Sequence, residues 1–342
     1  MEKIYLLSCQ NALPFVQSVL QELGKFCTQN EFHFVKSSEN YFANGEVKTV
    51  IEESVRGKEV FIVQSVESSQ YNQNVLHKRT LNDNLMALFT AIDAAQRAGA
   101  KAVHVLLLPY PYSRQDKQKS REPITARIIA QFLESLNVHT LITVDIHAES
   151  IAGFFRKTHF LNINTSNLLI KHFLQNYGQE MEDLVVVSPD VGGAVRARYY
   201  ASKLQANLAL VSKERDYTQL NKVEKVTLIG DVQDKYALIV DDMIDTGGTM
   251  VNVVKLLKEN SVKKILIAAP LGLFSSPCAQ RFDSLFQEKL LDKVIVTNAI
   301  NHGDAFAFDH EWLEVISLAP FFAQLFVCLA KKGSVTELLE NI

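Results

Sequence analysis

The segment from residue 236 to residue 252, YALIVDDMIDTGGTMVN, constrains the fold of this chain more than any other stretch. It opens on Tyr236 to Val240, five strand-forming residues that are apolar enough for a strand buried on both faces of a parallel sheet. Two carboxylates, Asp241 and Asp242, follow at once, and a glycine-containing turn then leads into a helical pattern from Met250 to Lys258. The segment therefore predicts a strand, a polar loop and a helix of an α/β protein.

The turn in this segment has the composition of a phosphate-binding loop. Its adjacent glycines allow positive φ, so several backbone N–H groups can turn toward one point at the positive end of a helix dipole. The carboxylates just upstream can accept hydrogen bonds from neighbouring hydroxyls, which favours a polyol with a terminal phosphate, such as a pentose 5-phosphate. The alternative is an ordinary strand–turn–helix with acidic residues at its edge. The residues of the turn are Asp245, Thr246, Gly247, Gly248 and Thr249.

Length and composition indicate a globular protein with more than one domain. At 342 residues the chain exceeds the size at which a single core stops growing, and its formal charge of −3 gives no broad basic surface for nucleic acid. The four cysteines lack metal-site spacing, so we expect buried thiols and a cytoplasmic location. We expect no membrane segment, because the longest apolar stretch, Ile316 to Ala330, is too short and is predicted to be a buried helix begun by Pro320.

Short apolar runs alternate with helical segments along the whole chain. This alternation predicts parallel sheets covered by helices, with ligand sites at the carboxyl ends of the strands. Three of the strands end in aspartate, within VDIH at 144–147, SPD at 188–190 and VDD at 240–242, which favours a rim of carboxylates. We place the domain boundary after residue 163, giving domains 1–163 and 164–342. The expected strands are 60–63, 102–108, 140–144, 184–187, 208–211, 237–240, 264–268 and 293–296.

The strand, the paired acids and DTGGT together resemble the ribose-phosphate binding motif of the type I phosphoribosyltransferase fold. Over nearly its full length the chain is similar to the ribose-phosphate pyrophosphokinase family, through FANGE at 42–46, YSRQD at 112–116, VDIHAESIAGFF at 144–155 and SPD at 188–190. The resemblance implies two tandem phosphoribosyltransferase-like α/β domains. It also implies transfer of the diphosphoryl group of ATP to ribose 5-phosphate, with Mg²⁺ as cofactor, in a homo-oligomer built from dimers and completed as a hexamer.

The FANGE segment is a turn in a region that otherwise has strand character. Taken alone, it favours a hairpin with a packed phenylalanine. In the family a similar segment contacts the nucleotide base and reaches a neighbouring subunit, which implies that Phe42 stacks on adenine. Asn44, Gly45 and Glu46 would then bind the polar edge of the base.

A basic loop, residues 109–125, follows the strand predicted at 102–108. A run of charge is usually a solvated surface, but at the end of a buried strand it is placed to meet a polyanion. The resemblance implies that Arg114 and Gln115 in this loop hold the nucleotide.

The remaining site residues also rest on the resemblance. A histidine two residues after a strand-end aspartate is more often a core histidine, but here His147 and Asp190 are implied to flank Mg²⁺. Lys213 and Arg215 match two catalytic cations of a flexible loop, a segment that by itself is typical of an exposed hairpin. The residues implied to bind ribose 5-phosphate are Arg215, Asp241, Asp242, Asp245, Thr246, Gly247, Gly248 and Thr249.

Some segments depart from the family pattern. Residues 65–80 form an insertion in which Lys78 and Arg79 are predicted to be exposed, before a helix expected over Leu81 to Ala98 with Asn82 or Asp83 as its cap.

Two other functions stay open. A salvage phosphoribosyltransferase would share DTGGT but consume the diphosphate product, and a regulatory subunit would bind the ligands without catalysis.

Overall fold

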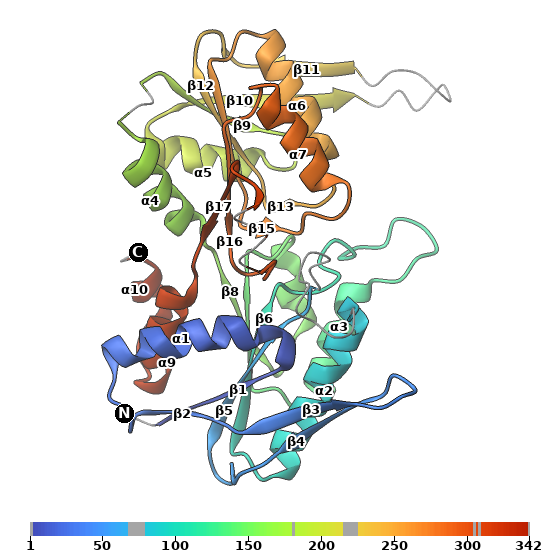
Figure 1. The fold of residues 1–342 in the computed structure, drawn as a ribbon. Helices are drawn as coiled ribbons and strands as arrows, with labels where there is room; N and C mark the ends of the chain where they lie inside the picture. The colour runs from blue at the N-terminus through green and yellow to red at the C-terminus, as the bar shows by residue number, and fades with distance from the viewer. Residues whose placement is uncertain are drawn as a thin grey trace. The chain divides into compact units, whose positions relative to one another are not determined.

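The computed structural model describes residues 3–67, 79–179, 182–214, 225–303, 306 and 309–340, and Figure 1 labels its elements. The chain divides into two compact units. Unit 1 comprises Met1–Asn164, Asn298–Gly303 and Ser317–Ile342, and unit 2 comprises Thr165–Thr297 and Asp304–Ile316. The prediction of one domain over 164–342 therefore does not describe the last part of the chain, which groups with unit 1.

Unit 1 contains a six-stranded parallel sheet in the order β2-β1-β5-β6-β7-β8. A separate antiparallel hairpin, β3–β4, packs on α2, where the Thr49 and Thr90 hydroxyls lie 2.9 Å apart. The strands are β1 (Ile4–Ser8), β2 (Phe32–Phe34), β3 (Ser37–Tyr41), β4 (Val47–Ile51), β5 (Glu59–Ser65), β6 (Ala102–Leu108), β7 (Thr140–Val144) and β8 (His159–Ile163). The helices are α1 (Leu13–Phe26), α2 (Leu81–Arg97), α3 (Thr125–Ser135), α9 (Ala319–Ala330) and α10 (Val335–Glu340), with 3-10 turns η1 (Gln10–Ala12) and η2 (Glu149–Phe154).

Helix α9 joins unit 1 because its apolar side chains are buried there. The rings of Phe15 on α1 and Phe322 on α9 have centroids 5.7 Å apart, and Phe326 packs on Phe61 of β5 at 5.2 Å. The predicted buried helix is confirmed, and Pro320 lies in its first turn. Within the described part of the chain, none of the helices combines the length and the apolar character that a membrane crossing needs.

Unit 2 contains a seven-stranded sheet in the order β11-β10-β9-β12-β14-β16-β17, parallel except for the antiparallel pair β10–β11. Figure 1 shows α4 and α5 on one side of this sheet and α6 and α7 on the other. The strands are β9 (Leu184–Ser188), β10 (Asn207–Glu214), β11 (Lys225–Ile229), β12 (Tyr236–Val240), β14 (Lys264–Ala268), β16 (Lys293–Thr297) and β17 (Leu313–Ile316), with a small parallel pair β13 (Met243–Ile244) and β15 (Leu271–Gly272). The helices are α4 (Ser166–Tyr177), α5 (Ala194–Leu204), α6 (Gly248–Glu259) and α7 (Cys278–Gln287).

The predicted α/β class with parallel sheets is confirmed, and β6, β7 and β14 have the predicted bounds. Helix α2 begins differently from the prediction. Its cap is Thr80, whose hydroxyl accepts a hydrogen bond from the Asp83 N–H, while the Asp83 carboxylate accepts one from the Thr80 N–H at 2.7 Å. This reciprocal capping box satisfies two N–H groups at the helix start.

Arg79, just before this cap, was predicted to be exposed, and that prediction is wrong. Its side chain is only 10% exposed and pairs with Glu39 at 2.8 Å. The guanidinium also lies 4.1 Å from the ring centroid of Tyr41 and donates to Gln10. The side chain is largely buried because a carboxylate, an amide oxygen and an aromatic ring take the place of water around the guanidinium.

Candidate active site

The predicted phosphate loop lies between β12 and α6. Gly247 has φ of +75° and stands directly before the first residue of α6, and none of the described side chains caps this helix start by a hydrogen bond. The first N–H groups of a helix lack partners within the helix, so this turn leaves donors at the positive end of the dipole. Thr246 and Thr249 are exposed on either side of the two glycines. The structure therefore brings backbone donors and hydroxyls together at one turn.

The paired carboxylates stand at the carboxyl end of β12. Asp242 is buried, and its N–H donates to the Asp241 carboxylate at 2.9 Å. Burial and the nearby Asp242 charge raise the pKa of Asp241 to about 8, well above its usual 3.8. At neutral pH the two carboxyls therefore hold a proton that solvated aspartates would have released.

Arg196 is a site residue that the sequence analysis missed. Its Nη1 lies 3.6 Å from Asp241 Oδ1 and 3.8 Å from Asp242 Oδ1. The positive charge lowers the pKa of Asp241, opposing the larger effect of burial. The sequence feature that could have identified Arg196 is its position in the first turn of α5, directly after the SPD segment that ends the neighbouring strand β9.

Asp190 and Lys213 belong to the same edge of the unit 2 sheet. Strand β9 pairs in parallel with β12, with Val187 opposite Ile239, so the loops that carry Asp190 and Asp241 leave the sheet at the same edge. Strand β10 pairs with β9 through Leu210 and Ser188 and continues beyond it to Lys213. The structure describes the backbone of Lys213, while Arg215 lies outside the described residues.

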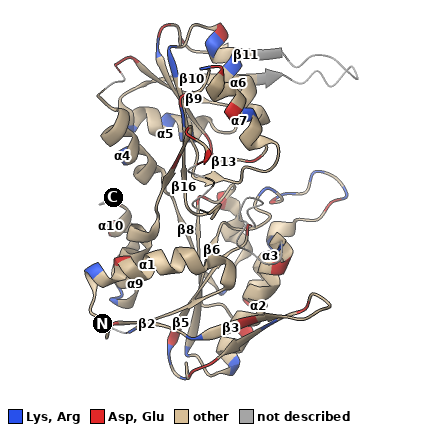
Figure 2. Ribbon diagram, in the orientation of Figure 1, with Lys and Arg blue, Asp and Glu red and all other residues tan. Residues whose placement is uncertain are grey.

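In unit 1 the basic loop and the VDIH segment follow adjacent parallel strands, β6 and β7. Arg114, Gln115 and His147 are exposed at that sheet edge, and Figure 2 shows basic residues along the loop between β6 and α3. The Thr125 hydroxyl donates to Gln115 Oε1 at 2.5 Å, and the Ala126 N–H donates to the Gln115 carbonyl. These bonds orient Gln115 so that its amide nitrogen remains a donor.

The FANGE segment is the turn of the β3–β4 hairpin. Phe42 is 51% exposed, an uncommon environment for a large aromatic ring. Gly45 has φ of +90°, and the Asn44 side chain accepts a hydrogen bond from the Glu46 N–H at 3.2 Å. The hairpin predicted from the residues alone is confirmed, but its phenylalanine is exposed instead of packed.

Of the two predicted metal ligands, Asp190 has the chemistry of a carboxylate that can bind Mg²⁺ together with a substrate. Among the described residues, no group of three or more His, Cys, Asp and Glu side chains is arranged to hold an ion. Magnesium commonly takes one or two protein carboxylates and fills its other positions with water and substrate phosphates. Asp190 offers an exposed carboxylate held by the Gly193 N–H at 2.8 Å, which fits that pattern. The imidazole of His147 is a less typical Mg²⁺ ligand.

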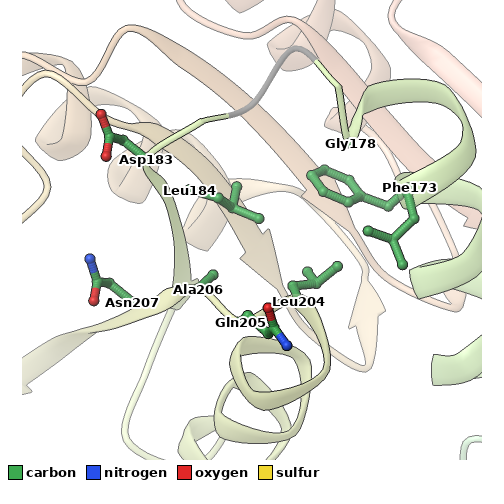
Figure 3. A pocket seen from close by; sticks show the side chains of 9 residues that line it. Phe173, Gly178, Asp183, Leu184, Leu204, Gln205, Ala206 and Asn207 are labelled. Atoms are coloured by element: carbon green, nitrogen blue, oxygen red, sulfur yellow. The ribbon is translucent and has the colours of Figure 1, made fainter.

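Unit 2 also contains a cavity of about 270 Å³ that is separate from the candidate site (Figure 3). Its lining includes Asp183 and Leu184 at the start of β9, Asn207 at the start of β10, and Gln205 after α5. These residues are at the amino ends of strands whose carboxyl ends carry Asp190 and Lys213. The cavity is therefore at the opposite edge of the sheet from the candidate site.

Sequence comparison connects this geometry with a known family. A family model described as the N-terminal domain of ribose phosphate pyrophosphokinase matches residues 4–136, and one described as a phosphoribosyl transferase domain matches residues 158–304. A ribose-phosphate pyrophosphokinase of Mycoplasma pneumoniae is 38% identical over 95% of this chain and 94% of its own length. A ribose-phosphate pyrophosphokinase of Listeria ivanovii is 34% identical over 99% of this chain and 98% of its own length.

Comparison with solved structures indicates the same family. The crystal structure of phosphoribosylpyrophosphate synthetase from Mycobacterium smegmatis is similar with a TM-score of 0.83 and 32% identity, covering 97% of this chain and 100% of that one. A similarity of this extent includes both units of the chain. The chain belongs to the ribose-phosphate pyrophosphokinase family.

Proposed function

We propose that this chain transfers the diphosphoryl group of ATP to O1 of ribose 5-phosphate, with the residue roles given below. The observation that carries the proposal is the uncapped start of α6 beside a pair of carboxylates at one sheet edge. In the reaction, O1 bonds to the β-phosphorus of ATP as the bond from that phosphorus to the AMP oxygen breaks. AMP leaves, and the proton of the O1 hydroxyl passes to solvent.

Ribose 5-phosphate binds at the loop after β12. Its phosphate accepts hydrogen bonds from the N–H groups at Gly247, Gly248 and Thr249 and from the exposed threonine hydroxyls. Asp241 and Asp242 accept hydrogen bonds from the ring hydroxyls, and the Arg196 guanidinium offsets part of the negative charge of the two carboxyls. Asp245 is the first residue of this loop and belongs to the ribose 5-phosphate site. This arrangement fixes the sugar before the nucleotide arrives, which lowers the entropic cost of the reaction.

ATP binds to residues of unit 1. Arg114 and Gln115 hold the nucleotide, Phe42 stacks on the base, and Asn44 and Glu46 bind its polar edge. Mg²⁺ would be held by Asp190 and His147, and when bound it neutralises phosphate charge. The exposed Phe42 ring and the oriented Gln115 amide support these roles.

The catalytic contribution is mainly electrostatic. Lys213 and Arg215 stabilise negative charge that builds on the leaving AMP and on the transferred group, because phosphoryl transfer leaves the protein little covalent chemistry to perform. The backbone of Lys213 lies at the same sheet edge as Asp190, in agreement with this role.

A product assay tests the proposal. The purified chain is incubated with ATP and ribose 5-phosphate, with and without Mg²⁺, and followed by ³¹P NMR. We expect AMP and a new sugar diphosphate in equal amounts, and only with Mg²⁺. Consumption of added phosphoribosyl diphosphate with a purine base would instead indicate a salvage phosphoribosyltransferase. Binding of both substrates without turnover would indicate a regulatory subunit.

We also propose that the chain forms a homo-oligomer built from dimers and completed as a hexamer. Unit 1 exposes apolar side chains on neighbouring helices, with Met86 on α2 at 52%, and Ile128 and Phe132 on α3 at 37% and 50%. The Phe132 ring packs against Phe89 of α2 with centroids 5.8 Å apart, so α2 and α3 pack together next to these exposed side chains. Light scattering after size exclusion should give six times the chain mass, and Phe132→Asp should lower it. A monomeric wild-type chain would contradict the proposal.

A further inference from the structure

Helix α7 contacts the phosphate loop through Arg281. Its Nη1 donates a hydrogen bond to the Thr246 carbonyl at 2.7 Å. The residue is half-buried, and a Cβ added at Gly248 would lie 3.4 Å from the same Nη1. The Arg281 guanidinium, 35 residues beyond Thr246 in the chain, therefore holds the centre of the loop by a charge-assisted hydrogen bond.

This bond determines which way the Thr246–Gly247 peptide faces. In a trans peptide the carbonyl and the N–H point in opposite directions, and this peptide is not among the cis bonds of the described chain. Because the Thr246 carbonyl is directed at Arg281, the Gly247 N–H is directed away from it. The first donor of the loop therefore faces the side that α7 does not occupy.

On the α7 side, described side chains fill the space beside Gly247. A Cβ on Gly247 would lie 2.8 Å from Cys278 Sγ and 3.2 Å from a ring carbon of Phe282. Helix α7 is itself held in place, because the Phe282 ring packs on Trp312 at 5.2 Å and the Trp312 indole N–H donates to Asp283 at 2.7 Å. Among the described residues, α7 therefore blocks one side of the loop, and the Gly247 N–H points toward the opposite side.

We propose that Arg281 is a positioning residue for ribose 5-phosphate. It holds the Thr246 carbonyl so that the Gly247 N–H faces the 5-phosphate, and it does so without touching the ligand. This inference rests on the proposed function, since it assumes that the sugar phosphate binds at this loop. Loss of the bond would let the peptide rotate and present a carbonyl oxygen to the phosphate, which repels it.

The test compares Arg281→Met, Arg281→Lys and a matched control, Arg198→Met, an exposed arginine of α5. Arg281→Met should weaken ribose 5-phosphate binding, measured by calorimetry, by about tenfold or more, as expected for loss of a charge-assisted bond. The KM for ribose 5-phosphate should rise by a similar factor while the KM for ATP stays within about twofold. Arg281→Lys keeps a charged donor and should recover most of the affinity, and the control should match the wild type.

A second readout separates positioning from general damage. Binding of ribose, which lacks the phosphate, should be the same in Arg281→Met as in the wild type, so the preference for the phosphorylated sugar falls. Trp312 is the single tryptophan of the chain, and its fluorescence reports whether the α7 region of each variant is folded. If Arg281→Met does not fold, Arg281→Gln, which also removes the charge, takes its place in the same comparison, and an unchanged ribose 5-phosphate affinity in that variant would refute the positioning role.

The two proposals fail in different ways. If wild-type chain binds ribose 5-phosphate and folded Arg281→Met binds it equally well, the positioning role is refuted and the proposed function stands. Equal losses of ribose and ribose 5-phosphate affinity would also refute it. If the wild type itself does not bind ribose 5-phosphate, the proposed function fails first, and the role of Arg281 fails with it.

Discussion

Replacing Asp241 by asparagine should change how the stability of unit 2 depends on pH. The wild-type carboxyl has its pKa raised to about 8, chiefly by burial and then by the Asp242 charge. Between pH 4 and pH 8 the folded chain therefore binds one more proton than the unfolded chain, and stability falls as pH rises through this window. An asparagine at this position would have no such proton to lose, and its side-chain oxygen can still accept the Asp242 N–H bond of 2.9 Å.

The size of the effect follows from the displacement of the pKa. Each pKa unit corresponds to about 1.4 kcal/mol, so a change from 3.8 to about 8 sets an upper limit of about 6 kcal/mol. The Asp241 side chain is 19% exposed, and water reaching it reduces the effective burial cost. We therefore expect Asp241→Asn to gain about 2–3 kcal/mol relative to the wild type between pH 5 and pH 8.5.

Urea unfolding followed by Trp312 fluorescence measures this difference, because the only tryptophan of the chain is buried in unit 2. The measurement is made without substrates at several pH values between 5 and 8.5. Glu259→Gln, which removes an exposed carboxylate of α6, is the control and should follow the wild type at every pH. If the curves for Asp241→Asn and wild type run parallel over this range, Asp241 does not carry the buried proton and the reasoning is refuted.

Three further substitutions test other parts of the molecule. Lys213→Ala should lower turnover by about a hundredfold or more with ribose 5-phosphate binding largely kept, and unchanged turnover in steady-state assays would remove Lys213 from the reaction. Gly247→Ala should weaken ribose 5-phosphate binding by calorimetry about tenfold or more, because φ is +75° and the new Cβ would meet Cys278 Sγ at 2.8 Å; wild-type affinity would contradict this strain. Arg79→Met leaves the Glu39 carboxylate, 8% exposed, without its cation, so hydrogen exchange should show unit 1 about 3 kcal/mol less stable, and a loss below about 0.5 kcal/mol would contradict the buried pair.

The sequence predicted those elements whose pattern is local. Strand β12 and the start of α6 followed from an apolar run, two acids and two glycines, because period and glycine conformation are properties of neighbouring residues. Strand β8 escaped prediction, since residues 159–163 are only partly buried and show a weak apolar pattern. The cap of α2 was misplaced because Asn82, Asp83 and Thr80 are all suitable capping residues, and only the bonds formed distinguish them.

The residues of the candidate site also fall into two classes, those that a local sequence pattern predicts and those that only the folded structure brings to the site. The residues of the phosphate loop and the strand-end acids are contiguous or follow strands, so the sequence alone was enough to predict them as site residues. Arg196 and Arg281 reach the site from α5 and α7, at separations along the chain that no local pattern specifies. The roles assigned to Phe42, Arg114 and His147 came from family resemblance, and they remain predictions.

The sequence by itself determined the alternation of apolar strands with helices, the chemistry of the turn at 245–249 and the family of the chain, because these depend on residues that are neighbours or that match as segments. Only the tertiary structure decided that α9 belongs with unit 1, that Arg79 is buried, and that two arginines stand beside the carboxylates and behind the loop. The physical reason is that burial and charge pairing arise from packing between distant segments, which fixes the surroundings of a side chain independently of its sequence neighbours.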